Sequence, residues 1–417
     1  MKKHFKNLAL FFLSILGLLF LSKEFRIYFT RPLRVENLKT VNSLNIPEME
    51  FQIPKKVQQK FDLIYRKYDT DYSSKKYKSF VKYLNKNNTW EKAKLTYLNK
   101  TYHVLVKLHG KTPSQHFEND YYSLGIKMLG DEKINDVSRF NLIVYWRNRY
   151  KPDLIKFLAK KMNLNFKENI LTKIKINNKR EKLYYFEFRL NQEYLKKTNK
   201  NDFIRLKGKN DHSLIYSSGD IETYKPRLKK AINKIDTNDS IKNIIYNEYL
   251  SLSKSIHDKD LEKVLTHFDV DYLSRVQAFR YLYSDNGHGF YGGNLLMVFN
   301  TSNLKFYPIL HRDNSPRFKK QKISGQFNGS DLIGNAGPLF NTLSKSKILS
   351  EKTKNYLTKL LLQSNINEHS MDSIIKHHNT YYYSSTFKQL IYGQSSNPYT
   401  MHMKNLISSL SQPVTHK

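Results

Sequence analysis

Apolar positions recur with two different periods along the chain, and the change of period divides it into a β-rich half and a helical half. Alternating or continuous apolar runs predict strands in the first half. A period of three to four residues predicts helices, most of them in the second half. The predicted strands are 94–98, 101–108, 121–128, 170–176 and 182–188, and the predicted helices are 153–162, 240–255, 258–267, a segment ending near Asp285, and 353–362.

Three pairs of predicted strands are separated by short polar turns, and we expect each pair to form a hairpin. The turns are Asn99-Lys100, Asn177-Asn178-Lys179 and Thr301-Ser302-Asn303. The third hairpin joins 295–299 to 305–310. Pairing Phe299 with Leu304 places Asn294 opposite Ile309, so that Asp285, Asn294 and Asp313 gather at one end of the hairpin.

This third hairpin is the candidate active site. A loop with four glycines between 287 and 293 precedes it. Two carboxylates and an amide beside such a loop suit a divalent cation and a phosphate, because Mg²⁺ prefers oxygen ligands. The structural alternative is that Asp285 caps a helix, Asn294 starts a strand and Asp313 lies in an ordinary turn.

Glu187 is an acid in an apolar strand, between Tyr184-Tyr185-Phe186 and Phe188. A buried carboxylate needs a cationic partner. We expect Lys127, near the end of a neighbouring strand, to be that partner, in the manner of the lysine–carboxylate pair behind a kinase phosphate site. The alternative is that Lys127 is one surface lysine among many.

The N-terminus carries an apolar run at 8–21, preceded by three lysines. At about 1.5 Å per residue this run is about 21 Å long, the size of a signal-peptide core. Because no small-x-small cleavage site follows, we expect 1–34 to be an uncleaved signal-anchor that attaches the chain to a membrane, with the body outside the cytoplasm in the cell envelope. A cleaved signal is the alternative. Residues 35–90 are predicted to be a linker and a helical adaptor.

Composition narrows the function further. The chain has 417 residues, a net charge of +35 and no cysteine. The absence of cysteine excludes a thiol nucleophile, a thiolate metal site and a disulfide framework. The lysines are scattered, and no arginine-rich arm, zinc-finger spacing or aromatic RNA-binding signature is present, so we expect no nucleic-acid partner.

The order of motifs resembles the spore-coat-protein-H (CotH) kinase-like family over about residues 90 to 350. The matching segments are KLHGKTPSQHF, YYSLGIKM, DLIKFLAKKMNLN, ILTKIKINNKREKLYYFEFRLNQEYLKK and the stretch from 279 to 314. Asp285, His288 and Asn294 stand at the family's Asp, His and Asn, and Asp313 stands at the last Asp of its Trp-Asp-x-Asp tetrad. The chain departs from the family at His109 in place of Arg and His311 in place of the first tetrad Asp.

The resemblance implies an α+β, atypical protein-kinase-like two-lobed fold, with a β-rich lobe at 91–200 and a mostly helical lobe with the active-site hairpin at 201–417. It implies transfer of the γ-phosphoryl group of ATP to protein Ser or Thr hydroxyls. Asp285 would orient and deprotonate the acceptor, Asn294 and Asp313 would hold Mg²⁺ or Mn²⁺, and Lys127 with Glu187 would bind ATP. His288 and His311 would support the loop.

Two other functions fit parts of the pattern. His288 and His311 with Asp285 and Asp313 could hold the metal of a hydrolase, although no tight metal-binding spacing supports it. A kinase-like envelope scaffold that binds a partner without catalysis is the second alternative.

Overall fold

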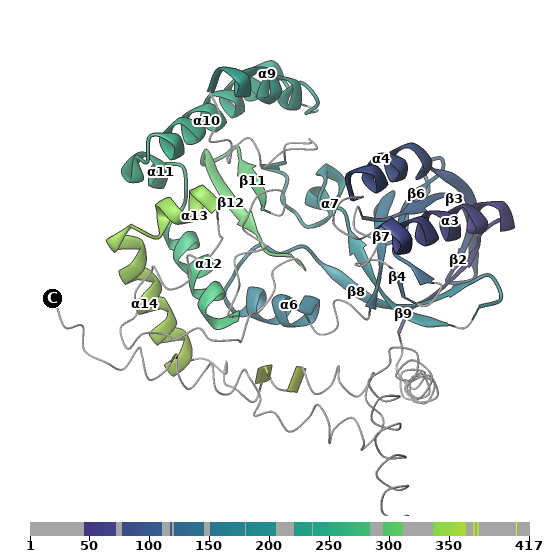
Figure 1. Ribbon diagram of the computed structural model, residues 1–417. Helices are drawn as coiled ribbons and strands as arrows, with labels where there is room; N and C mark the ends of the chain where they lie inside the picture. Colours follow the sequence, from purple (N-terminus) through teal and green to yellow (C-terminus); the bar gives the residue numbers. More distant parts are fainter. Residues whose placement is uncertain are drawn as a thin grey trace, which may run out of the picture.

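The computed structural model describes the main body of the chain. The described residues are 46–71, 77–110, 117–118, 121–145, 151–179, 181–205, 221–235, 237–283, 295–311, 337–363, 370–371, 373–374 and 406. Figure 1 shows a β-barrel with helices packed against it, beside a mostly helical region that also contains a small sheet. Helix α6 (Lys151–Lys161) and the segment after it lead from one part to the other.

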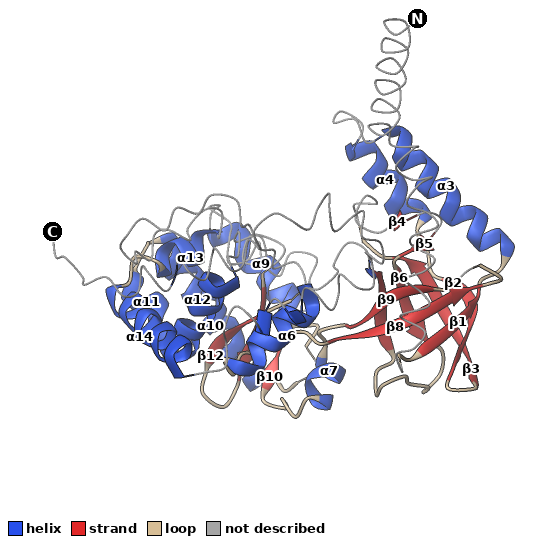
Figure 2. Ribbon diagram, turned by 90° about the horizontal axis from the view of Figure 1, so that it is seen from below, coloured by secondary structure: helices blue, strands red, loops and turns tan. Residues whose placement is uncertain are grey.

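Seven strands close into a barrel in the order β1-β2-β3-β6-β7-β9-β8. Parallel pairing of β1 with β8 closes the barrel, and the other neighbours are antiparallel (Figure 2). The strands are β1 (Glu48–Gln52), β2 (Glu91–Tyr97), β3 (Lys100–Leu108), β6 (Leu124–Met128), β7 (Arg139–Val144), β8 (Asn169–Ile176) and β9 (Lys182–Phe188). A short separate sheet is formed by β4 (Phe117–Glu118) and β5 (Tyr121–Tyr122).

The barrel follows from the alternation of side chains along its strands. In β3, Val104, Val106 and Leu108 are buried inside, whereas the residues between them face outward. The β2–β3 hairpin turns at Leu98 and Asn99, which have φ of 49° and 61°. Positive φ at both central residues is the backbone of the type I′ turn, whose twist matches that of the strands it joins.

The expectation of an atypical protein-kinase-like two-lobed fold is wrong, because the N-terminal strands form this closed barrel. Two strands that the sequence analysis did not predict make the closure. β7 lies between β6 and β9. β1 joins β2 to β8. Residues 48–52 therefore belong to the barrel and not to the linker expected at 35–90.

Two helices pack against the barrel, α3 (Lys55–Asp71) and α4 (Tyr77–Asn87). Their buried residues Phe61, Ile64, Phe80 and Leu84 belong to the same hydrophobic core as the barrel interior. The Phe61 ring meets the Tyr122 ring edge to face at 5.7 Å between centroids. The predicted helical adaptor is therefore part of the barrel's core.

The remaining elements form the helical region. It contains α9 (Ile221–Ile232), α10 (Asp239–His257), α11 (Leu261–Thr266), α12 (Val270–Tyr283), α13 (Gly337–Leu343) and α14 (Lys347–Gln363), with α7 (Gln192–Lys197) preceding it. The sheet β10-β11-β12 is formed by Phe203–Ile204, Leu296–Asn300 and Lys305–Ile309. Helix α12 is buried along nearly its whole length and contacts α14, α6 and β12.

The predicted hairpin of β11 and β12 is confirmed, but its register is wrong by two residues. Phe299 pairs with Phe306 rather than with Leu304, and Leu296 pairs with Ile309. The turn from 301 to 304 is longer than the three-residue turn that the sequence predicted, and Leu304 takes a positive φ of 57° within it. Pro308 fits β12 because this strand lies at the edge of its sheet, where a missing N–H is tolerated.

No helix within the described part of the chain is long and apolar enough to cross a membrane. The predicted signal-anchor at 8–21 lies outside the described residues.

Candidate functional site

The outer face of the barrel carries a row of polar residues that is almost wholly buried. The strand registers place Lys107, Gly125, Asn141, Glu187 and Asn169 side by side across β3, β6, β7, β9 and β8. Glu187 is 1% exposed, and Asn141 and Asn169 are also buried. Polar groups at this depth require polar partners, so the row is a built arrangement and not solvated surface.

Glu187 is held by two partners from different elements. The Asn141 side-chain amide donates to Glu187 Oε1 at 2.7 Å, and Lys167 Nζ lies 2.9 Å from the same oxygen. The Lys167 side chain is only 13% exposed. This buried carboxylate–ammonium pair is tolerated only while both charges are present, because either charge alone would carry a large desolvation penalty.

The expected partner of Glu187, Lys127, is wrong. Lys127 lies on β6 opposite Arg139 of β7, one row away from Asn141 and Glu187. Its cross-strand neighbours are therefore a cation and Leu105. Lys167 is the partner of Glu187 instead. It lies two residues before Asn169, which pairs with Glu187, so Lys167 is on the same outer face as Glu187.

Residues 164–169, which we call the junction segment, connect α6 to β8 and bind the end of β12. Leu310 N donates to Asn165 O at 2.9 Å, and Lys167 N donates to Leu310 O at 2.8 Å. Phe166 and Leu310 form a parallel β-bridge. Lys167 therefore reaches Glu187 from a backbone that is fixed to the strand of the predicted active-site hairpin.

Two buried tyrosines fix the junction segment from either side. Asn165 N donates to Tyr272 Oη at 3.1 Å, and Tyr272 Oη donates to Pro308 O at 2.6 Å. Glu168 N donates to Tyr194 Oη at 3.0 Å. Burial raises the pKa of Tyr272 above its ordinary value, and burial raises the pKa of Tyr194 to about 12. Both phenols are therefore neutral near pH 7 and able to donate, Tyr272 to Pro308 O and Tyr194 to Phe166 O at 3.3 Å.

His311 directly follows Leu310 and is 4% exposed. The structure thus brings two of the predicted features, Glu187 and the end of β12 with His311, to the same junction segment, through the unpredicted Lys167. Asp285, His288, Asn294 and Asp313 lie outside the described residues. Within the ranges that are described, no group of three His, Asp or Glu side chains is arranged to hold a metal ion.

The sequence analysis did not identify Lys167 and Asn141. Asn141 lies within the apolar run RFNLIV, just as Glu187 lies within LYYFEF. A single polar residue inside each of two apolar runs was a signal that the two strands meet. Lys167 gave no such signal, because it lies in a short polar segment among many lysines.

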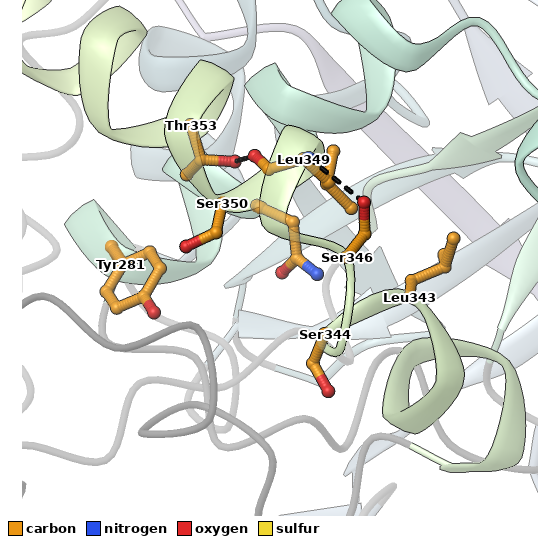
Figure 3. Close-up of a pocket in the computed structure, with 8 residues that line it drawn as sticks. Tyr281, Leu343, Ser344, Ser346, Leu349, Ser350 and Thr353 are labelled. Atoms are coloured by element: carbon orange, nitrogen blue, oxygen red, sulfur yellow. Dashed lines mark hydrogen bonds between the residues drawn. The ribbon is translucent and has the colours of Figure 1, made fainter. Parts of the chain in front are cut away.

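A small cavity lies between α12 and the α13–α14 connection (Figure 3). Hydroxyl groups line it, from Tyr281, Ser344, Ser346, Ser350 and Thr353, with Gln277 beside them. The Leu349 amide donates to Ser346 Oγ at 3.1 Å, and Thr353 Oγ1 donates to Leu349 O at 2.6 Å. Its volume of about 10 Å³ has room for about one water molecule. It is therefore part of the packing around α14 and is too small for a nucleotide.

No protein-family model matches the chain, and no curated protein sequence matches it.

Proposed function

We propose that the chain is an ATP-dependent phosphotransferase that acts on Ser or Thr hydroxyls of proteins. The observation that carries the proposal is the buried Lys167–Glu187 pair, with Nζ and Oε1 2.9 Å apart, on a segment bonded to the end of β12. Phosphoryl transfer needs charges held in fixed positions rather than covalent chemistry from the protein. A lysine oriented by a buried carboxylate supplies such a charge. The barrel does not weaken the proposal, because one chemistry recurs on unrelated folds.

Lys167 replaces Lys127 as the residue proposed to contact the ATP phosphates, with Glu187 and Asn141 keeping its ammonium in place. Asn294 directly precedes Leu295, and Asp313 follows His311 by two residues. Leu295 and His311 adjoin the same pair of strands, β11 and β12. The described residues nearest in sequence to the two proposed metal ligands therefore lie at the same end of one hairpin.

The roles of the other residues follow the chemistry of hydroxyl attack. Asp285 orients the acceptor hydroxyl and takes its proton. Asn294 and Asp313 offer the oxygen ligands that Mg²⁺ or Mn²⁺ prefers. A divalent ion bound there neutralises charge on the ATP phosphates. The apolar run at 8–21 anchors the enzyme in the cell envelope, with its acceptor proteins outside the cytoplasm.

The proposal is tested with the full chain, purified in a mild detergent and incubated with γ-labelled ATP and Mn²⁺. Label in the chain itself or in an added acidic protein measures transfer. Asp285→Asn, Asp313→Asn and Lys167→Met should each reduce incorporation at least about 100-fold, the scale of a lost charge-stabilising group. Lys230→Gln, on the exposed face of α9, removes one positive charge elsewhere and should change nothing.

Incorporation that persists in both aspartate variants would reject the assignment of these residues. His311→Ala separates the hydrolase alternative: a hydrolase that uses His311 as a metal ligand loses all activity, whereas the phosphotransferase retains part of it.

A further inference from the structure

Three cations lie side by side on the outer face of the barrel. Lys127 of β6 pairs with Arg139 of β7, and the register that pairs Phe140 with Phe188 continues to place Arg189 opposite Arg139. We call Lys127, Arg139 and Arg189 the cation row. Arg139 and Arg189 are exposed to solvent, while the residues beside them in the strands are buried inside. Like charges directly opposite each other on antiparallel strands are destabilising, so the barrel gains no stability from this row.

Lys107 extends the cation row toward the buried Glu187. Its Nζ lies 4.6 Å from the centre of the Trp90 ring. Gly125 separates Lys107 from Asn141, and a Cβ there would lie 3.6 Å from Lys107 Cγ and 3.7 Å from Trp90 Cη2. Gly125 is itself buried and these are ordinary van der Waals distances, so Lys107 and Trp90 pack over the glycine beside Asn141. Burial, followed by the nearby Arg189 and Arg139, lowers the pKa of Lys107, which agrees with three cations close together.

The acids around the cation row are engaged with other groups. Glu187 is held by Lys167 and Asn141, and its attraction for Arg189 only partly opposes the lowering of the Arg189 pKa by burial and by Arg139. Glu193 accepts from Ser138 N and Ser138 Oγ. Among the residues that the structure describes, no carboxylate oxygen lies within 4.0 Å of a side-chain nitrogen of Lys127, Arg139 or Arg189.

Two lysines elsewhere in the structure have acidic partners. Lys197 lies 3.1 Å from Asp136, and Lys100 lies 2.9 Å from Glu132. What distinguishes the row is that its cations lie beside one another on adjacent strands.

We propose that Lys107, Lys127, Arg139 and Arg189 form a binding site for an oxyanion of the phosphate class that carries two or more negative charges. Two guanidinium groups side by side present several N–H donors to phosphate oxygens. The aromatic ring of Trp90 beside Lys107 supports one edge of the site. The ligand can be the phosphates of a nucleotide or a phosphate group on an acceptor, because both offer the same oxygens.

This inference goes beyond the proposed function, because anion binding at the cation row requires no phosphoryl transfer. It also concerns different residues from the Lys167–Glu187 pair. A Lys167→Met/Glu187→Leu double variant should lose transfer and retain the anion site, so the two proposals can fail separately.

The test is a titration of the full chain with inorganic pyrophosphate at constant ionic strength, in which isothermal titration calorimetry measures the binding. We expect one pyrophosphate per chain. Arg139→Gln and Arg189→Gln should each weaken binding at least about tenfold, the effect of losing about 1.4 kcal/mol. Lys230→Gln should bind as the wild type does. With Trp146 replaced by Phe, emission comes from Trp90 alone. It should change on binding when both arginines are present and stay unchanged when either arginine is replaced by Gln.

Unfolding temperatures of the variants show whether they are folded. Without ligand, Arg139→Gln and Arg189→Gln should melt at or above the wild-type temperature, because they relieve repulsion, and pyrophosphate should no longer stabilise them. Absence of pyrophosphate binding would overturn the proposal. So would an equal loss of affinity in Lys230→Gln, or unchanged affinity in both arginine variants.

Competition then identifies the source of the anion. Displacement of pyrophosphate by ADP assigns the site to a nucleotide, and displacement by a phosphoserine peptide assigns it to an acceptor. Displacement by neither leaves free phosphate anions as the ligand.

Discussion

Replacement of Lys167 by Met is the perturbation whose effect on stability can be worked out most directly. Glu187 is 1% exposed and keeps its bond from Asn141 at 2.7 Å, but it loses the ammonium 2.9 Å away. Removal of one partner of a buried pair costs about 3–5 kcal/mol. Because the Asn141 amide still donates to the carboxylate, we expect the lower end, about 3 kcal/mol.

Removal of the carboxylate should cost less. In Glu187→Leu the remaining Lys167 side chain, already 13% exposed, can turn its ammonium toward water. We expect a loss of about 1 kcal/mol, since the lysine keeps its hydration. In the double variant Lys167→Met/Glu187→Leu both charges are gone, and an apolar replacement of a buried pair is often neutral. The double variant should therefore be within about 1 kcal/mol of the wild type.

Urea unfolding of the four proteins, followed by far-ultraviolet circular dichroism, measures these free energies of unfolding. The coupling energy between Lys167 and Glu187 should be about 3–5 kcal/mol, at or above the upper end of the range seen for residues in direct contact. A Lys167→Met protein within about 0.5 kcal/mol of the wild type would refute the reasoning. So would single effects that simply add in the double variant, because the two side chains would then act independently.

Three further predictions concern the junction segment and α14. Burial raises the pKa of Tyr194 from 10.0 to about 12. The stability that this residue contributes is therefore complete below pH 10 and declines by about 2–3 kcal/mol as pH rises to 12. The difference in free energy of unfolding between the wild type and Tyr194→Phe should shrink over that range. Tyr272→Phe removes the bond to Pro308, and unfolding experiments should show a loss of about 1–3 kcal/mol. Ser346→Ala removes the oxygen that caps Leu349 N and should lower the melting temperature, with a loss of about 1 kcal/mol.

Local signals predicted most of the individual elements. Asn99-Lys100 and Asn177-Asn178-Lys179 marked two hairpins, β2–β3 and β8–β9, and both are present. Helix α12 is present where its three-to-four-residue period predicted it, ending at Tyr283. These elements depend on residues close together in the sequence, where turn chemistry and side-chain periodicity decide the structure.

The closure of the barrel could not be predicted in this way, because it depends on pairs distant in sequence. β1 pairs Met49 with Ile174, and nothing near residue 49 marks that partner. The register of the β11–β12 hairpin was wrong for a related reason. The sequence does not show how many residues its turn contains, and the pairing of Phe299 with Phe306 fixes it at a longer turn.

The candidate site was predicted in part. The burial of Glu187 followed from its apolar neighbours, whereas its partner depended on β7 and on the junction segment, neither of which the sequence analysis placed. Lys167 is recognisable only when Asn165 and Leu310 are seen bonded to each other. Asp285, His288, Asn294 and Asp313 stay predictions, since they lie outside the described residues.

The most direct test of the proposed phosphotransferase is equilibrium binding of ATP with Mn²⁺ to the full chain, measured by calorimetry, because it needs no knowledge of the acceptor. The account predicts one ATP bound per chain in a Mn²⁺-dependent manner. This Mn²⁺-dependent binding should be lost in Asp313→Asn and in the Lys167→Met/Glu187→Leu double variant and retained in Lys230→Gln. ATP that does not bind to the wild type, or that binds equally well to all of these variants, would contradict it.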